Sequence, residues 1–105
     1  MHGMTAMTKV EIIVPARDAP GMRDLIAAAG ATGYTSVPGV SGIGHHGQHC
    51  GALLFNDVDT LTMLITVLPH ERAGELIAAV RALLDGRSGV MFVTDTYVSR
   101  PDYFQ

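Results

Sequence analysis

The chain repeats one local plan twice, and this duplication limits the folds open to it. Residues 10–15 are rich in β-branched side chains and end in proline, and residues 25–28 after them carry an apolar helical pattern. Residues 64–69 and 76–79 repeat the same series of features. Each half therefore predicts a strand, a helix, a glycine turn and a second strand, which is a doubled β-α-β unit.

The segment between the two halves does not repeat. It begins with glycines at positions 39, 42 and 44, and it continues with three histidines and the only cysteine, Cys50, between positions 45 and 50. Duplicated halves supply a scaffold, whereas loops added to a scaffold commonly carry function. We therefore expect the function of the chain in this segment.

The composition excludes several classes of protein. The 105 residues fit one domain, which we place at residues 9–105, after a leader over residues 1–8 that we expect to be disordered. The net charge is −3, the one lysine is Lys9 and the arginines are scattered, so a nucleic-acid binder is not expected. Cys50 has no partner for an internal disulfide, and no apolar run is long enough to cross a membrane. Together these features favour a cytoplasmic protein.

Local signals predict four strands and two helices. We expect strands at about 9–14, 34–43, 61–68 and 89–98, with a bulge or an edge position at Pro38 and Gly39. The first helix is expected to begin with Asp18 as its N-cap and Pro20 in its first turn, and to end at Gly30. The second helix is expected to end near Gly86, and its apolar stripe consists of Ala73, Leu76, Ile77, Val80, Leu83 and Leu84.

The order β-α-β-β-α-β predicts an α+β fold of the ferredoxin-like type. In that fold both helices cover one face of a four-stranded antiparallel sheet. Apolar residues fill most odd-numbered and most even-numbered strand positions, so the uncovered face is expected to be apolar too. A monomer rarely exposes such a face to water, which predicts self-association.

Several short motifs, taken in order, resemble the PII signalling family. They are Ala29-Gly30 with Gly33 and Thr35, then Gly42-Ile43-Gly44 before a loop, then a strand that ends in Pro69, then the run at 89–95. The resemblance spans about residues 9–100 and is greatest to the PII-like proteins found beside carboxysome and bicarbonate-transport genes. It implies a homotrimer that binds adenine nucleotides in the clefts between subunits.

The resemblance also implies a site. It places a T-loop at about 44–59, a B-loop at about 85–89 and a C-terminal segment at 99–105. Thr35 would lie near the adenine, and Arg100 would approach from a neighbouring subunit. The other residues implied for nucleotide binding lie at the start of the T-loop and in the B-loop: Gly42, Ile43, Gly44, His45, His46, Gly86, Arg87, Ser88 and Gly89. Glycines let backbone N–H groups approach phosphate oxygens, and arginine offers a planar pair of donors to the same anion.

The chain departs from the family pattern in ways that bear on the ligand. His45 stands where a basic residue usually follows Gly-x-Gly, Val90 stands at the lysine position of the B-loop, and the B-loop is shortened. Fewer fixed positive charges favour ADP or AMP over ATP, and bicarbonate is a further expected ligand. No tyrosine lies between Tyr34 and Tyr97, so tyrosyl uridylylation is not expected.

These features predict a regulatory protein and not an enzyme. The sequence shows no triad and no activated nucleophile, and we interpret Asp57 and Asp59 as residues that end the loop. Nucleotide binding is expected to order or release the T-loop, which would engage a membrane bicarbonate transporter or a carboxysome-linked protein. The expected role is control of inorganic-carbon uptake or of carboxysome-linked metabolism, with no nucleic-acid contact and no direct membrane insertion.

Other interpretations remain open. His45, His46, His49 and Cys50 bring imidazole and thiolate groups into one loop, and zinc, copper and nickel prefer such ligands. A metal-binding PII-like or CutA-like protein is therefore the alternative, and a slow nucleotide hydrolase built on the same cleft is the third reading. Locally, residues 42–44 and 86–89 also fit ordinary turns, and Arg100 also fits a solvated side chain.

Overall fold

The chain folds into one antiparallel sheet with two helices packed on it. The structure is a computed structural model that describes residues 2–42 and 60–105. Two short 3-10 helices, at Ala16–Asp18 and Pro101–Tyr103, accompany the main elements. The main elements are β1 (Thr5–Pro15), α1 (Ala19–Ala28), β2 (Thr35–Val40), β3 (Leu61–Leu68), α3 (His70–Leu84) and β4 (Val90–Val98).

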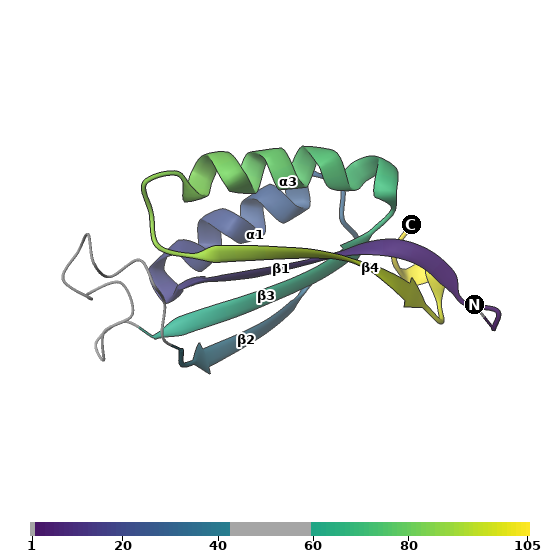
Figure 1. The fold of residues 1–105 in the computed structure, drawn as a ribbon, viewed down its shortest axis with the longest axis horizontal. Coiled ribbons are helices and arrows are strands. Elements are labelled where there is room, and N and C mark those ends of the chain that lie inside the picture. Colours follow the sequence, from purple (N-terminus) through teal and green to yellow (C-terminus); the bar gives the residue numbers. More distant parts are fainter. Residues whose placement is uncertain (1, 43–59) are drawn as a thin grey trace.

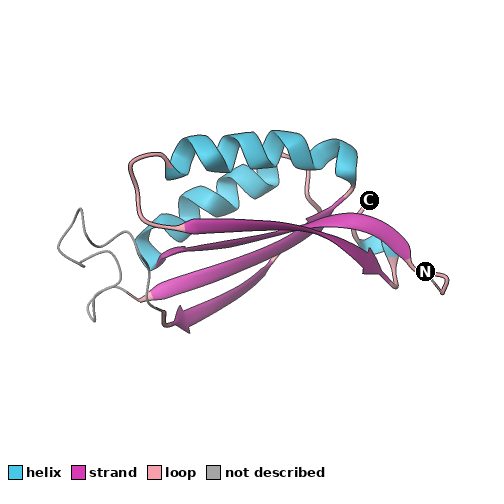
Figure 2. Cartoon of the chain, in the orientation of Figure 1, coloured by secondary structure: helices cyan, strands magenta, loops and turns pink. Residues whose placement is uncertain are grey.

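The sheet has the strand order β2-β3-β1-β4, with antiparallel pairing between all neighbours. Figure 1 and Figure 2 show α1 and α3 together on one face of the sheet, with the opposite face left without a helix. This is the ferredoxin-like arrangement that the doubled β-α-β pattern predicted. The two central strands come one from each half of the duplication, and β2 and β4 form the two edges.

The core lies between the sheet and the helices. Val10, Ile12 and Val14 of β1 alternate toward the helices and are fully buried. Their partners in β3 continue the same surface, since Ile12 pairs with Leu64 and Val10 with Thr66. The helices contribute the positions expected from their apolar periodicity: Met22 and Ile26 of α1, and Ala73, Leu76 and Val80 of α3.

A buried threonine ties the sheet to the loop that leads into β2. Thr66 is 2% exposed, and its hydroxyl donates a hydrogen bond of 2.7 Å to the carbonyl oxygen of Gly33. A buried hydroxyl without a partner would destabilise the fold, so this bond explains how a polar residue is accommodated among apolar ones.

The uncovered face is largely apolar, with a charged pair on its central strand. Ile13 of β1 shares this face with Met63 and Ile65 of β3, and all three are only partly buried. Lys9 and Glu11 lie on the same face and form an ion pair of 3.5 Å between Nζ and Oε1. The prediction of an apolar second face therefore holds for β3 but is wrong for the middle of β1.

Two strand boundaries differ from expectation. β1 begins at Thr5 and not near Lys9, because residues 5–8 pair with residues 95–98 of β4. Part of the expected disordered leader is therefore strand. β2 ends at Val40, and its register against β3 shifts between Pro38 and Val40, with Gly39 at φ +72°. The bulge and the edge position predicted for this strand are both confirmed.

Glycines end both helices, as predicted. Gly30 follows α1 with φ +83°, and Gly86 follows α3 with φ +74°, a conformation that residues with a Cβ rarely adopt. Asp18 occupies the N-cap position of α1, but its side chain makes no capping hydrogen bond. Among the described residues, no helix combines the length and apolar character needed to cross a membrane.

Candidate functional site

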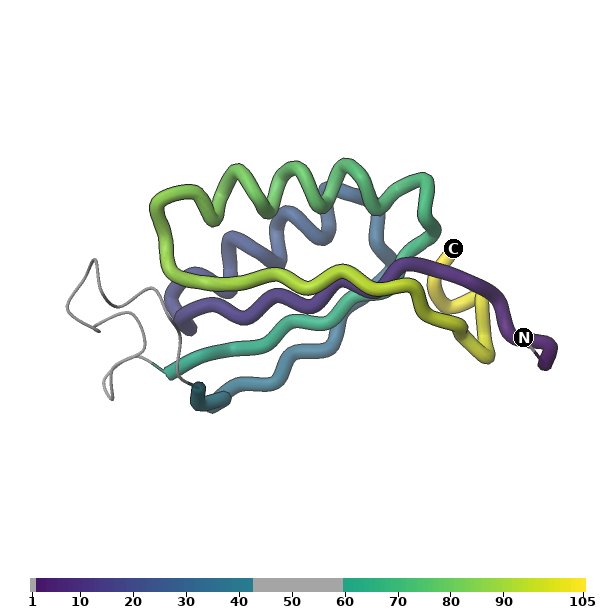
Figure 3. Tube along the Cα trace, viewed as in Figure 1, coloured from purple at the N-terminus to yellow at the C-terminus, as the bar shows by residue number. Residues whose placement is uncertain are grey.

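The end of β2 and the turn before β4 lie at the same end of the sheet. Val40 pairs with Leu61 at the start of β3, and Pro15 at the end of β1 pairs with the same residue. The first residue of β4, Val90, pairs with Ile13. Figure 3 shows this end opposite to the one where the two chain termini lie. Gly42 and the turn at 86–89 are therefore brought to one end of the molecule.

Within one chain, however, these two groups occupy opposite edges of the sheet. Strands β3 and β1 separate β2 from β4, and three interstrand spacings place the two edges about 14 Å apart. Gly42 and Arg87 of one chain therefore follow and precede strands on opposite edges of the sheet.

The turn between α3 and β4 has a conformation that the core dictates. A Cβ built on Gly89, where φ is +138°, would lie 2.8 Å from Val14 Cγ1, 2.8 Å from Leu84 Cδ2 and 3.1 Å from the carbonyl oxygen of Ile13. Ser88 is buried, at 7% exposure. Glycine at position 89 thus has a structural reason that is independent of any ligand.

Arg87 is the basic residue of this turn, and its side chain reaches solvent. Its backbone N–H donates to the carbonyl oxygen of Leu84 at 2.9 Å, which fixes the turn. Its guanidinium donates from Nη1 to Oδ1 of Asp18 at 3.3 Å, with the arginine side chain 53% exposed and the aspartate side chain 15% exposed. A guanidinium in this position can bind an anion at the surface once it leaves the carboxylate.

Arg100 lies at the other end of the sheet. Val98 pairs with Thr5, and eight residue steps along β4 separate Val98 from Val90, about 27 Å of extended strand. The Arg100 guanidinium donates to the Tyr103 hydroxyl at 3.0 Å and stands 5.6 Å from the centre of the Tyr103 ring. Arg87 and Arg100 of one chain therefore cannot contact the same phosphate group.

The remaining predicted positions are divided between described and undescribed residues. Thr35, at the start of β2, pairs with Ile65 and is exposed, and Gly42 is exposed with open space around the position of a Cβ. The other residues predicted at the start of the T-loop, Ile43, Gly44, His45 and His46, lie outside the described residues, as do the alternative metal ligands His49 and Cys50. The rest of the described chain contains no group of three or more histidine, cysteine or acidic side chains able to hold a metal ion.

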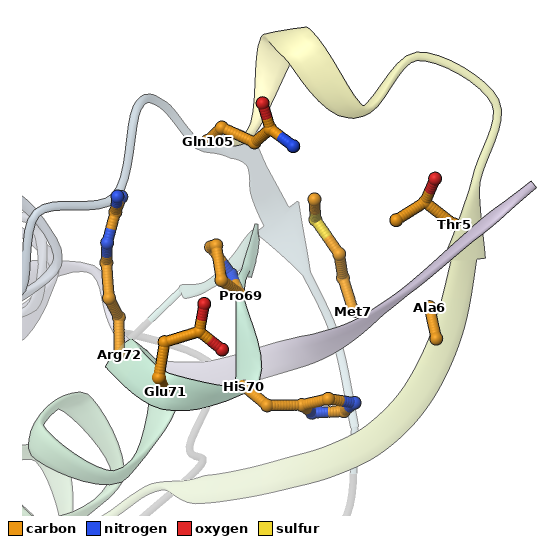
Figure 4. A pocket seen from close by; sticks show the side chains of 8 residues that line it. All are labelled: Thr5, Ala6, Met7, Pro69, His70, Glu71, Arg72 and Gln105. Atoms are coloured by element: carbon orange, nitrogen blue, oxygen red, sulfur yellow. The ribbon is translucent and has the colours of Figure 1, made fainter.

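A separate hollow of about 310 Å³ lies beside the first turn of α3. Figure 4 shows side chains from three parts of the chain around it: the start of β1, the start of α3 and the C-terminal residue Gln105. His70 on its wall is hydrogen-bonded through Nδ1 to the Thr8 hydroxyl, and Arg72 donates to the Gly30 carbonyl oxygen at 3.1 Å. These side chains tie helix to sheet and loop, and the described residues predicted for nucleotide binding do not line the hollow.

Sequence reasoning missed the two side chains that contact the candidate arginines. The sequence predicts only a capping role for Asp18, which lies 69 positions before Arg87, so no local pattern indicates the pair. Tyr103 lies three residues after Arg100 and was detectable, because a tyrosine so close to an arginine is a common ring and hydroxyl partner.

Comparison with known proteins assigns the chain to a family. The family model "Nitrogen regulatory protein P-II" matches residues 7–103. CPII from Thiomonas intermedia, in a structure bound to ADP, AMP and acetate, has a TM-score of 0.82 and 36% identity, with 96% of each chain covered. A structure of CPII bound to ADP and bicarbonate has a TM-score of 0.83 and 33% identity, with 97% of each chain covered.

A putative PII-like signalling protein from Thermus thermophilus shares the fold, with a TM-score of 0.76 at 17% identity over 97% of this chain and 98% of that one. A search of the curated proteins found no match. The match to the family model over nearly the whole chain, the fold and the identity to CPII agree with one another. The chain belongs to the family of the nitrogen regulatory protein P-II.

Proposed function

We propose that this protein is a cytoplasmic, homotrimeric regulator that binds ADP or AMP between subunits, with bicarbonate as a further ligand. One observation carries the proposal: CPII, at 33–36% identity over nearly the full length of both chains, is described with ADP, AMP and bicarbonate bound. The proposed binding residues are those of the sequence analysis, from Thr35 and Gly42 to the turn at 86–89 and Arg100.

The position of these residues favours a site shared between subunits. Gly42 and Arg87 lie at one end of the sheet but on opposite edges, and Arg100 lies at the other end. A head-to-tail interface joins different surfaces of identical subunits and closes into a ring when the rotation allows it. Such an interface can bring the β2 edge of one subunit beside the β4 edge of the next, which no arrangement within one chain achieves.

The uncovered sheet face supports self-association. Met63, Ile65 and Ile13 present apolar side chains there, and Phe92 on the edge strand β4 is 52% exposed. Burying this surface in a trimer would stabilise the assembly by about 25 cal/mol for each Å² of apolar area removed from water. The Lys9 and Glu11 charges on the same face pair with each other at 3.5 Å, so they oppose burial less than two isolated charges would.

The charge of the turn before β4 favours a short phosphate chain. Arg87 is the one basic residue between positions 85 and 90, and Val90 is apolar. Each further phosphate adds negative charge that needs a partner, so we expect ADP and AMP to bind more tightly than ATP. In the proposed role, occupancy of this site controls contact with a bicarbonate transporter or a carboxysome-linked protein, and the chain performs no catalysis.

Light scattering and calorimetry test the proposal. A trimer at micromolar subunit concentration is expected, and a stable monomer would refute the shared site. On a chelator-washed sample, titration with ADP, AMP, ATP and bicarbonate should give saturable heats for ADP or AMP. Heat from zinc alone, with none from any nucleotide, would instead support the metal-binding alternative at the histidine-rich loop.

A further inference from the structure

Asp18 is placed to hold Arg87, and capping its own helix does not explain the placement. It occupies the N-cap position of α1, where an aspartate commonly accepts a hydrogen bond from the helix. Its side chain makes no such bond, and Oδ1 instead accepts from Nη1 of Arg87 at 3.3 Å. The Asp18 side chain is 15% exposed and the Arg87 side chain 53% exposed, so the carboxylate is mostly buried and the guanidinium lies on the solvent side.

A carboxylate and a phosphate use the same donors of a guanidinium. Asp18 accepts one such bond, from Nη1, and its negative charge attracts the same guanidinium that a phosphate would attract. The backbone of the turn is held at Arg87, whose N–H is bonded to the Leu84 carbonyl oxygen at 2.9 Å. Rotation of the Arg87 side chain, which is 53% exposed, can transfer it from one anion to the other.

We propose that Asp18 competes with the nucleotide phosphate for Arg87 and thereby lowers the ADP affinity of the protein. The inference rests on the proposed function, since it concerns the same site. Asp18 lies outside the proposed nucleotide site and sets the ADP affinity through its contact with Arg87. When Arg87 turns to the phosphate it gives up this ion pair, and the free energy of the pair then opposes nucleotide binding.

Arg100 provides an internal contrast. Its partner is the neutral side chain of Tyr103, through a hydroxyl at 3.0 Å and the ring face at 5.6 Å. A phenol orients a guanidinium but does not neutralise its charge. Arg100 thus keeps its full charge for an anion while held, whereas the charge of Arg87 is partly neutralised by Asp18.

Calorimetric titration of ADP into trimeric wild type and Asp18→Asn tests the inference. Asparagine keeps the shape of the side chain but removes its charge, and an exposed pair of this kind is weak, so ADP should bind about two- to fivefold more tightly. Asp24→Asn removes the same charge from the exposed surface of α1 and measures the general electrostatic effect. In an Arg87→Ala background, Asp18→Asn should leave the ADP affinity unchanged.

Each result decides a separate question. Tighter binding in Asp18→Asn, absent from the Arg87→Ala background and larger than in Asp24→Asn, supports competition. Equal or weaker ADP binding in Asp18→Asn, with normal binding by wild type, overturns the inference alone, and weaker binding would mean that Asp18 positions Arg87 for the ligand. Absence of ADP and AMP binding by wild type overturns the proposed function and the inference with it. Thermal melts of each variant confirm that the comparison is made between folded proteins.

Discussion

Replacement of Gly89 by alanine should destabilise the fold far more than the same replacement of Gly86. Both glycines have positive φ, +74° at Gly86 and +138° at Gly89, and both lie in the turn proposed to approach phosphate. They differ in their surroundings. A Cβ at Gly86 meets nothing within 4 Å, whereas a Cβ at Gly89 meets Val14, Leu84 and the backbone of Ile13 at 2.8, 2.8 and 3.1 Å.

These distances give the expected magnitudes. The backbone conformation alone costs an alanine about 1–2 kcal/mol, which is the whole effect expected for Gly86→Ala. At Gly89 overpacking adds about 1–3 kcal/mol. The end of the Leu84 side chain can rotate away, but Val14 is fully buried and the Ile13 carbonyl belongs to β1, so neither can yield freely. The total for Gly89→Ala is about 2–5 kcal/mol.

Thermal unfolding followed by circular dichroism measures the difference. At about 4 °C per kcal/mol for a domain of this size, Gly86→Ala should lower Tm by about 4–8 °C and Gly89→Ala by about 8–20 °C. All proteins must be compared at one subunit concentration, because association contributes to the apparent stability of an oligomer. A Tm for Gly89→Ala equal to or above that of Gly86→Ala would refute the argument that packing against the core selects glycine at position 89.

Three further predictions concern the arginines and the buried threonine. Arg87→Ala and Arg100→Ala should each weaken ADP binding at least tenfold in calorimetry while the fold survives. Each removes a charge-assisted bond to phosphate of about 1.5–3 kcal/mol. Unchanged affinity in both variants would reject the site. Tyr103→Phe keeps the ring and loses the hydroxyl, so ADP binding should weaken by about two- to tenfold, and a larger loss would show that the hydroxyl itself meets the ligand. Thr66→Val should lower the unfolding free energy in denaturant melts by about 1–3 kcal/mol, because the Gly33 carbonyl loses its donor at 2.7 Å. The control Thr60→Val, at an exposed position, should change it by less than about 0.5 kcal/mol.

The residues proposed for the site were implied by the resemblance to the PII family, and their binding role stays a prediction. The division of these residues between two edges and two ends of the sheet was not predictable from spacing. It follows from strand order and register, which join residues far apart in the chain. The reason for Gly89 was likewise hidden, because the atoms that exclude a Cβ there include side chains from β1 and α3.

The sequence alone determined the elements whose signals are local. The strand Leu61–Leu68, the glycine after each helix and the bulge at Gly39 all agree with expectation, because periodicity, proline and positive φ act within a few residues. Only the tertiary structure decided the rest. Pairing with β4 extends β1 back to Thr5, and the Asp18 side chain binds Arg87 instead of capping α1. Such outcomes depend on which distant strand or charge lies within hydrogen-bonding reach, and chain topology sets that proximity where local propensity cannot.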